Sequence, residues 1–412
     1  MQIKHHKTIL ISAYTCNPYG VSESLAAFNF VKILLKKFSV ILLTTRENEI
    51  FINEYFKNDS NLHLKIISFK DTYPGKKVPI IKDSIKLGYF IFNYKIRRFL
   101  KQNTEIIQKS DILYHKSPSS FRYFSNLSKF NKTFIFGPTG GGLQTPPIIK
   151  KFFRNENKIL KLRKFDQFLL NTSFYKKHYR SADIILITLP YVKDILGDEF
   201  EDKYVEIFDT GIDTNLHTNN SIFSDDNRIC FVGRLTPYKG AELLIKAIHL
   251  IHNKYPDLKV EIVGDGEERE KLIGLCQKLK IIHKINFHGH LPHQEVKDIY
   301  KNSSIFCFPT LTEASGNSLL EAMSYSLPIV TINNGGPKFM CPDEGSFKVD
   351  IDAPEKMIKA ISNSIDILLK NKDLRIKMGE INRAHCIKNY DWNVLELKVL
   401  EVFYNKISEL DD

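Results

Sequence analysis

Two cations follow a short apolar run in the second half of the chain, in the segment GRLTPYKG. Arg234 comes directly after the apolar run, and Lys239 stands five residues later, where an amphipathic segment begins. Arginine offers a planar fork of N–H donors and lysine a point charge, a combination that suits the oxygens of a diphosphate. Taken alone, such a pair near the start of a helix is also typical of a solvated surface.

Two carboxylates stand eight residues apart in a later segment, SSIFCFPTLTEASGNSLLEAMSYSLPIVTINNGGPK. The run SIFCFP predicts a short buried strand, with Glu313 in the loop beyond it and Glu321 about one turn inside the next helix. Glu321 is placed to accept hydrogen bonds from the vicinal hydroxyls of a ribose, and Glu313 to hold the hydroxyls of a sugar. Taken alone, two such glutamates are better explained as a helix cap and a surface residue than as ligand-binding residues.

Backbone groups add to these side chains. The residues Ala-Ser-Gly-Asn precede the helix that holds Glu321, so its first turn offers free N–H groups and a positive dipole end to a phosphate. Two more loops, VGDGEERE and HGHLP, also follow short apolar runs and carry small or polar residues. Because ligands bind at the carboxyl ends of strands in open α/β sheets, the four loops together indicate one binding edge.

The elements that must position these loops occur twice in the chain. The first half contains, in order, the segments KTILISA, YTCNPYG, SESLAAFNFVKILLKKF and SVILLTT. The second half contains a matching series, NRICFVG, RLTPYKG, AELLIKAIHLIHNKY and LKVEIVG. Each series is an apolar run, a Gly-bearing turn, a segment of helical period and a second apolar run. This pattern predicts βαβ units, and its repetition predicts an α/β fold of two facing Rossmann-like domains.

The length of 412 residues fits two domains better than one core. We expect an N-terminal acceptor-binding domain over residues 1–206 and a linker over 207–227, where Asn, Asp, Thr and Ser are frequent and no periodicity is seen. A C-terminal donor-binding domain is expected over 228–390. Residues 391–412 are expected to form a helix that packs back on the N-terminal domain.

The ordered set GRLTPYKG, VGDGEERE, HGHLPHQEV and EASGNSLLEAMSYSLPIV resembles the donor-binding domain of the family-4 retaining glycosyltransferases, which have the GT-B fold. Glu313 and Glu321 match the two glutamates of that family's signature. The first half is similar to a subgroup of the same family in SAYTCNPYGVSES, YHKSPSSFR, FGPTGGGLQTPP and TGID. The resemblance covers nearly the whole chain, and the combined motifs are specific.

The resemblance implies a role for each matched residue. Arg234 and Lys239 neutralise the donor diphosphate, Glu321 binds the ribose, and Glu313 contacts the transferred sugar as a catalytic residue. His115 matches the catalytic histidine beside that sugar. The remaining donor-binding positions lie in loops and at the start of a helix: Gly20, Leu291, Gly316, Asn317, Ser318 and Leu319.

One loop departs from the family pattern. Val21 stands where the subgroup normally has a second glycine, and Tyr19 replaces a small residue, although Gly20, Ser22 and Glu23 are kept. A bulkier loop either approaches the diphosphate less closely or shapes a different acceptor pocket.

The implied reaction is the retaining transfer of a hexosyl unit from a nucleoside diphosphate sugar, with a UDP-sugar expected. The acceptor is expected to be a glycan or a lipid-linked glycan, in surface polysaccharide biosynthesis. Negative charge that builds on the leaving diphosphate would be stabilised by Arg234, Lys239 and helix N–H groups, so neither a metal ion nor a cofactor is expected.

Charge is distributed unevenly between the two halves. Residues 1–180 hold 32 Lys and Arg against 11 Asp and Glu, and the rest of the chain holds 27 against 36. Lys151, Arg154, Lys158 and Lys161 recur at helical spacing, and residues 86–101 form a second basic amphipathic stretch. Such stretches suit an anionic bilayer, although solvated helices of an acceptor domain explain them equally well.

Other features bound the location and the function. The six cysteines are scattered and contain no C-x-x-C pair, which fits buried thiols in a reducing compartment. No signal peptide or membrane-spanning run is found, so we expect a cytoplasmic protein that contacts the inner face of the plasma membrane. The alternative is a GT-B scaffold or regulatory subunit that binds nucleotide sugar without catalysis. Nucleic-acid binding is disfavoured, because the second half is acidic and no RNA- or DNA-binding motif is found.

Overall fold

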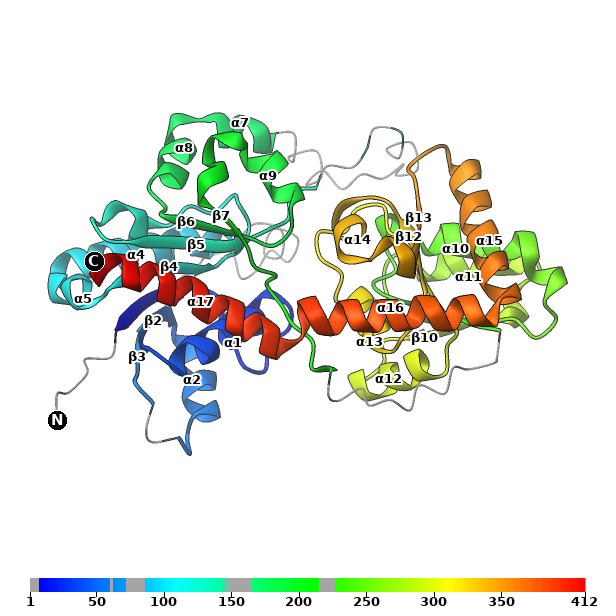
Figure 1. The fold of residues 1–412 in the computed structure, drawn as a ribbon, viewed down its shortest axis with the longest axis horizontal. Helices are drawn as coiled ribbons and strands as arrows, with labels where there is room; N and C mark the ends of the chain where they lie inside the picture. The colour runs from blue at the N-terminus through cyan, green and yellow to red at the C-terminus, as the bar shows by residue number, and fades with distance from the viewer. Residues whose placement is uncertain are drawn as a thin grey trace. The chain divides into compact units, whose positions relative to one another are not determined.

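The computed structural model describes residues 7–59, 62–71, 86–143, 165–214 and 227–411, with the single residues Pro146 and Ile148 (Figure 1). Its described residues form two compact units. The first takes those of Met1–Gly142, Lys158–Thr210 and Leu395–Asp412, and the second those of Leu143–Asn157 and Gly211–Val394. The predicted linker over 207–227 thus begins in the first unit and continues in the second.

A parallel sheet forms the centre of the first unit, with its described strands in the order β3-β2-β1-β4-β5-β6-β7. Strand β1 is the apolar run TILISA, which is buried because helices cover both faces of the sheet. The order reverses between β1 and β4, where connections leave in opposite directions. The strands are β1 Thr8–Ala13, β2 Ser39–Thr45, β3 Leu64–Phe69, β4 Ile112–Ser117, β5 Phe134–Thr139, β6 Ile184–Ile187 and β7 Tyr204–Glu206.

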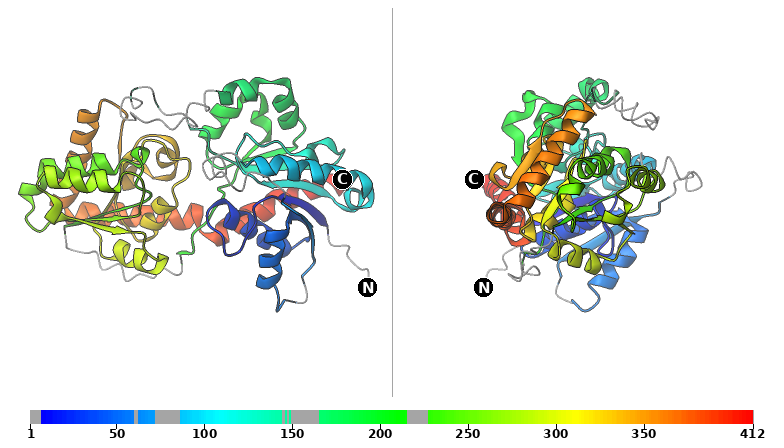
Figure 2. Two further views of the ribbon diagram at one scale, coloured as in Figure 1. Left: turned by 180° about the vertical axis from the view of Figure 1, so that it is seen from behind. Right: turned by 90° about the vertical axis from the view of Figure 1, so that its right-hand side faces the viewer.

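Two consecutive residues of β4, whose side chains point to opposite faces of the sheet, show which helix covers each face. Tyr114 contacts Phe403 of α17, whereas His115 contacts Tyr89 of α4. Helix α17 crosses in front of the sheet in Figure 1, and α4 lies in front when the molecule is seen from behind in Figure 2. The helices are α1 Glu23–Leu35, α2 Arg46–Tyr55, α4 Leu87–Gln102, α5 Thr104–Lys109, η2 Asn126–Lys129, α7 Phe165–Asn171, α8 Ser173–Arg180, α9 Tyr191–Leu196, η4 Asp198–Lys203 and α17 Trp392–Asp411.

The second unit is built on a similar parallel sheet, with its described strands in the order β10-β9-β8-β11-β12-β13. Here the order reverses between β8 and β11, which pair directly through Ile229 and Ile305. Apolar side chains fill both faces, as expected of a sheet covered by helices. The strands are β8 Arg228–Val232, β9 Lys259–Val263, β10 Ile285–Gly289, β11 Ile305–Phe308, β12 Ile329–Ile332 and β13 Ser346–Val349.

The helices of the second unit follow the strands in alternation, as the apolar periodicity predicts. Helix α15 begins at Pro354, where a missing N–H costs nothing, and α16 begins after Asn371, whose side chain accepts from the N–H of Leu374. The helices are η6 Pro237–Lys239, α10 Ala241–Ile251, η7 His252–Lys254, α11 Arg269–Lys278, η8 Ile282–Lys284, α12 His293–Lys301, α13 Asn317–Ser324, α14 Gly335–Met340, η9 Asp343–Gly345, α15 Pro354–Lys370 and α16 Lys372–Tyr390.

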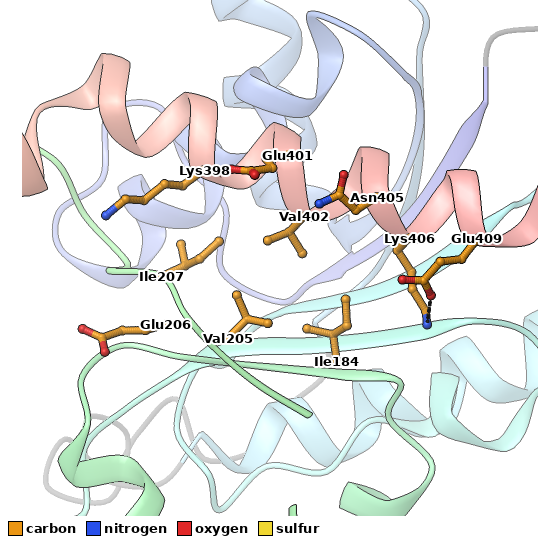
Figure 3. Close-up of a pocket in the computed structure, with 10 residues that line it drawn as sticks. All are labelled: Ile184, Val205, Glu206, Ile207, Lys398, Glu401, Val402, Asn405, Lys406 and Glu409. Carbon is orange, nitrogen blue, oxygen red and sulfur yellow. Dashed lines mark hydrogen bonds and ion pairs between the residues drawn. The ribbon is translucent and has the colours of Figure 1, made fainter. Parts of the chain in front are cut away.

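Helix α17 returns the chain to the first unit. Tyr404 packs on Phe38, and the ammonium of Lys36 lies 2.6 Å from the carboxylate of Glu396. A groove of about 360 Å³ remains between α17 and the edge strand β7, with Val205 and Val402 among its apolar walls (Figure 3). The predicted α/β fold of two Rossmann-like domains with a returning C-terminal helix is confirmed.

Two other predictions are tested by the described part of the chain. All six cysteines are buried and free. No helix within the described ranges is long and apolar enough to cross a bilayer. The basic stretch that includes Lys151, Arg154, Lys158 and Lys161 lies outside the described residues.

Gly240 allows the loop after β8 to approach β11 closely. Its φ of 79° is left-handed, and a Cβ there would stand 2.0 Å from the carbonyl oxygen of Pro309. We expect Gly240→Ala to lower the free energy of unfolding by about 3 kcal/mol, because backbone strain adds to a displacement of the chain. Chemical denaturation measures this change.

Gly274 provides the matched control for this substitution. It lies inside α11 with nothing within 4 Å of an added Cβ, so Gly274→Ala is expected to be neutral or to stabilise by about 0.5–1 kcal/mol. Equal effects of the two substitutions would show that Gly240 and Pro309 do not approach each other as described.

Candidate functional site

The predicted donor-binding residues of the second unit gather at the carboxyl edge of its sheet, where the strand order reverses. Arg234 and Lys239 follow β8, Glu313 follows β11, and these two strands are neighbours. A reversal of strand order leaves room for a ligand between the loops on either side. The topology therefore brings together cations and a carboxylate that are more than 70 residues apart in the sequence.

An ion pair joins the two loops at this point. The Lys239 ammonium contacts Oε2 of Glu313, and the side chains are only 12% and 13% exposed. The ammonium also lies over the ring of Phe308, 5.3 Å from its centroid. Because both charges are largely withdrawn from water, each depends on the other for compensation. Glu313 is thus held at the site by Lys239.

Arg234, unlike Lys239, has a guanidinium that is open to solvent. Its side chain is exposed, and the described part of the chain offers it no ion-pair partner. The backbone beside it is fixed, because the N–H of Leu235 donates to the Asp265 carbonyl at 2.9 Å. Gly264 permits this contact, since a Cβ there would stand 2.0 Å from the carbonyl oxygen of Gly233. The guanidinium is therefore free to bind an anion from a rigid loop.

Helix α13 points its N-terminus to the same edge. It begins at Asn317 after Gly316, which caps it without a side chain. As the first residues of a helix, Asn317 and Ser318 have N–H groups with no acceptor in a preceding turn, while Leu319 donates to the Gly316 carbonyl. The free N–H groups and the positive end of the helix dipole suit a phosphate or a sugar oxygen.

Glu321 lies one turn inside α13 and is half-buried. Burial raises the pKa of its carboxyl group, while a hydrogen bond from Tyr300 and the charges of His293 and Lys297 act in the opposite direction. The Tyr300 hydroxyl donates to Oε2 of Glu321 at 2.9 Å. One carboxylate oxygen is thereby fixed by the protein, which leaves the other for a ligand.

Tyr300 belongs to none of the motifs that identify the site. It comes from α12, is almost fully buried, and stacks on Tyr325 with 5.6 Å between ring centroids. Its sequence position, before a buried strand, gives no sign of a polar partner. An aromatic residue of helical period is ordinarily a core residue, and only the fold shows that its hydroxyl meets Glu321.

The loop after β12 supports the Glu313 loop. Gly336 donates its N–H to the carbonyl of Glu313 at 2.7 Å, and Asn334 donates a side-chain N–H to the carbonyl of Leu311 at 2.8 Å. A Cβ on Gly335 would stand 2.4 Å from the Glu313 carbonyl oxygen. The sequence NNGGP predicts a turn, but it does not reveal that this turn fixes the carboxylate loop.

Leu291 follows β10 and is partly exposed in the loop before α12. The preceding Gly289 forms an isolated bridge with Gly264, and this bridge joins the loop to the one beside Arg234. Leu291 therefore belongs to the same edge of the sheet as the other donor-binding candidates.

His115 lies in β4 of the first unit and has no exposed surface. Its ring stacks on Phe136 with 5.1 Å between centroids, and Nε2 lies 3.0 Å from the Pro118 carbonyl oxygen. Burial lowers its pKa to about 4, so the ring is neutral at pH 7, with Nε2–H donating to that carbonyl. Contact between His115 and a sugar stays a prediction.

The loop after β1 holds Gly20 and the two departures from the family pattern. The side chains of Tyr19 and Val21 are 59% and 81% exposed, so both present apolar surface to solvent. Ser22 has a φ of 52°, a conformation that glycine adopts far more easily. The structure therefore places backbone strain at Ser22, next to the position where the family has its second glycine.

The second unit matches known proteins by sequence. A model of the family described as glycosyl transferases group 1 matches residues 213–385. An uncharacterised glycosyltransferase of Haemophilus influenzae is 34% identical over 173 residues, which are 41% of this chain and 47% of that protein. The GPI3 subunit of the phosphatidylinositol N-acetylglucosaminyltransferase of Saccharomyces cerevisiae is 28% identical over 188 residues, which are 45% of this chain and 40% of that protein.

The chain spans about half or less of the length of these curated relatives. Solved structures match over a longer range. The Anabaena protein HepE in complex with UDP has a TM-score of 0.65 at 14% identity, with 97% of this chain and 100% of that chain covered. Sucrose-phosphate synthase from Thermosynechococcus elongatus has a TM-score of 0.66 at 15% identity, covering 98% and 100%. Residues 213–385 thus match the group 1 glycosyl transferases, and the chain has the GT-B fold.

Proposed function

We propose that the chain is a retaining hexosyltransferase of glycosyltransferase family 4, which moves a hexosyl unit from a nucleoside diphosphate sugar to a glycan or lipid-linked glycan. The observation that carries the proposal is the meeting of Lys239, Glu313 and the N-terminus of α13 at one reversal of strand order. This edge lies in the segment that matches the glycosyl transferase model. The UDP bound by HepE supports a UDP-sugar as donor.

The donor diphosphate is proposed to bind between the loop after β8 and the start of α13. Arg234 supplies a free guanidinium, Lys239 an ammonium, and Asn317 and Ser318 supply backbone N–H groups. The predicted N–H groups of Gly316 and Leu319 donate within the protein, to Met340 Sδ and to the Gly316 carbonyl. As the bond to the anomeric carbon breaks, negative charge gathers on the leaving diphosphate. Donors that are already in place stabilise this charge without reorganisation, which lowers the barrier.

The nucleoside is proposed to be held by Glu321 and the loop of Leu291. Glu321 accepts hydrogen bonds from the two ribose hydroxyls through the carboxylate oxygen that Tyr300 leaves free. Tyr300 acts as a positioning residue, because it touches the carboxylate and not the ribose. Leu291 offers an apolar contact beside the same edge.

Glu313 is proposed to contact the transferred sugar, and His115 and Gly20 are the proposed contributions of the first unit. When the diphosphate binds, Lys239 is shared between Glu313 and the phosphates. The carboxylate of Glu313 then becomes available for sugar hydroxyls. We expect a positioning role in which Glu313 forms no covalent bond to the sugar.

The acceptor is proposed to be part of surface polysaccharide biosynthesis, at the cytoplasmic face of the plasma membrane. The excess of Lys and Arg over residues 1–180 supports contact with anionic lipid. No partnership with nucleic acid is proposed. A nucleotide-sugar-binding scaffold without catalysis is the second candidate, because His115 is enclosed and Tyr19 and Val21 enlarge the loop at Gly20. Donor binding without any transfer would favour this second candidate.

Arg234→Ala is expected to weaken UDP binding by about tenfold to a hundredfold, since a charged hydrogen bond to phosphate contributes about 1.5–3 kcal/mol. The readout is the rise in melting temperature on addition of UDP, GDP and ADP, each tested with and without its sugar. Lys278→Ala removes an equal charge from an exposed position of α11 and is expected to leave the response unchanged. Stabilisation by none of the nucleotides, or an unchanged response of the Arg234 variant, would refute the donor site.

Glu321→Gln is expected to raise the melting temperature of the unliganded protein at pH 7.5 and to weaken UDP binding about tenfold to a hundredfold. Burial raises the pKa of Glu321, so the stability of the folded state falls as pH rises through this pKa. The neutral glutamine avoids that loss, and the difference in melting temperature should shrink as the pH is lowered towards 4.5, the ordinary pKa of a glutamate.

Tyr300→Phe is the companion variant. It removes the hydrogen bond that lowers the pKa of Glu321, so UDP binding should fail at a higher pH on the acid side than in the unaltered protein. An acid limb that does not move would show that Tyr300 has no influence on the carboxylate. Normal UDP affinity of Glu321→Gln would exclude Glu321 as the ribose ligand.

Transfer is expected to continue in excess EDTA, because Arg234, Lys239 and the α13 N-terminus supply the positive charge that the leaving diphosphate requires. The measurement is the rate of nucleoside diphosphate release with EDTA and with added Mg²⁺ or Mn²⁺. Loss of turnover in EDTA and its recovery with either cation would contradict metal independence.

A further inference from the structure

One surface of the first unit combines exposed aromatic rings with cations that lack acidic partners. On α4, the side chains of Phe90, Tyr94, Arg97 and Lys101 recur at intervals of four, three and four residues, which places them on one face of the helix. The first two are 37% and 62% exposed. The aromatic residues occupy the first half of this face and the cations the second half.

Helix α8 repeats the arrangement beside α4. Phe174 is 48% exposed, and Lys177 follows one turn later on the same helix. The ring of Phe124 joins the two helices, with centroid distances of 6.0 Å to Phe90 and 4.7 Å to Phe174. The aromatic ends of the two helices are therefore neighbours.

The basic ends of α4 and α8 both lie near a third element, at Lys129 of η2. Partial desolvation and the charges of Arg97, Lys101 and Lys177 lower the pKa of Lys129, so each of these three cations lies near Lys129. None of the four forms an ion pair with a carboxylate of the described residues. Uncompensated cations held together cost free energy unless an anion binds between them.

We propose that this aromatic–basic surface, made of Phe90, Tyr94, Arg97, Lys101, Lys129, Phe174 and Lys177, docks the protein on an anionic phospholipid bilayer. The inference deepens the membrane contact of the proposed function by assigning it to named residues. The cations bind lipid phosphates, each contributing about 1 kcal/mol near a negatively charged membrane, which corresponds to a factor of about five in affinity. The rings enter the interfacial layer beside them.

A bilayer fits this surface better than a free anion does, because apolar rings and cations occur along the same helix face. A soluble phosphate would use the cations and leave the rings in water. A membrane uses both, and it would bring the proposed lipid-linked acceptor to the enzyme.

The test is flotation of the full chain with vesicles of phosphatidylcholine and phosphatidylglycerol at 7:3, compared with pure phosphatidylcholine. The chain should bind only the anionic vesicles, and binding should weaken as salt rises from 50 to 500 mM. Substitution of Arg97, Lys101, Lys129 and Lys177 by Gln should lower the partition coefficient on the order of a hundredfold or more. Tyr94→Ser should lower it about threefold to tenfold at both salt concentrations, because the ring contributes apolar contact.

The matched control replaces Lys32, Lys37, Lys57 and Lys65 by Gln. These exposed residues belong to the same unit. Lys32 lies on α1, which packs on the same face of the sheet as α17, because Lys116 of β4 contacts Phe30 of α1 and points to the same face as Tyr114. Normal binding by this control and loss in the first variant would support the proposal. Equal loss in both variants, or no binding of the unaltered chain to anionic vesicles, would overturn it. Binding to RNA or an acidic polysaccharide without vesicle binding would overturn it too.

UDP stabilisation of the same variants separates this inference from the proposed function. The quadruple variant at the aromatic–basic surface should keep the full UDP response, because its four substitutions avoid the second unit. Vesicle binding without any UDP response would refute the donor site and leave the docking surface standing.

Discussion

The ion pair between Lys239 and Glu313 connects the two loops that carry the candidate diphosphate-binding and sugar-binding residues of the second unit. It joins the loops after β8 and β11, where the described strands of the second sheet reverse their order and send their connections to opposite sides. Both charges are nearly withdrawn from water, so neither can lose its partner without a replacement. In the proposed function, a diphosphate would supply that replacement for Lys239, and sugar hydroxyls would supply it for Glu313. The pair therefore holds the two loops together, and it would make binding of the diphosphate and of the sugar of the proposed donor depend on each other.

Backbone contacts make this arrangement possible. Gly240 brings the loop of Lys239 against Pro309, Gly264 brings the next loop against Gly233, and Gly336 donates its N–H to Glu313. In each case a side chain at the glycine would push apart two loops at the sheet edge where the site residues lie. The positions of the charges thus depend on residues that never touch a ligand, and the rigidity of the site comes from the sheet beneath it.

The sequence was sufficient to predict the fold and the place of the motif residues at the carboxyl edge of the second sheet. Alternating apolar runs and helical periods predicted two parallel sheets, and the placement of Arg234, Lys239 and Glu313 beyond strand ends predicted their meeting at one edge. It was insufficient for partners created by tertiary packing. Tyr300 looks like a core aromatic in the sequence, and its hydroxyl acquires a role only because α12 packs against α13.

His115 shows the opposite limit. The resemblance identified it, yet the enclosure of its ring by Phe136 and Tyr89 depends on side-chain packing that no local pattern encodes. The cations Arg97, Lys129 and Lys177 likewise come from three elements, and only the fold brings them together. Composition revealed the excess of positive charge in the first 180 residues, but not the surface on which part of it collects.

The most direct test of the central claim is calorimetric titration of UDP into four proteins: the unaltered chain, Glu313→Gln, Lys239→Gln and the double variant. If Lys239 passes from Glu313 to the diphosphate, Glu313→Gln should bind UDP more tightly, because Lys239 is released and a repelling carboxylate is lost. Lys239→Gln should lower the affinity for UDP by about tenfold or more. The gain in affinity from Glu313→Gln should be smaller in the Lys239→Gln variant than in the unaltered chain. Unchanged affinity in both single variants would contradict the account.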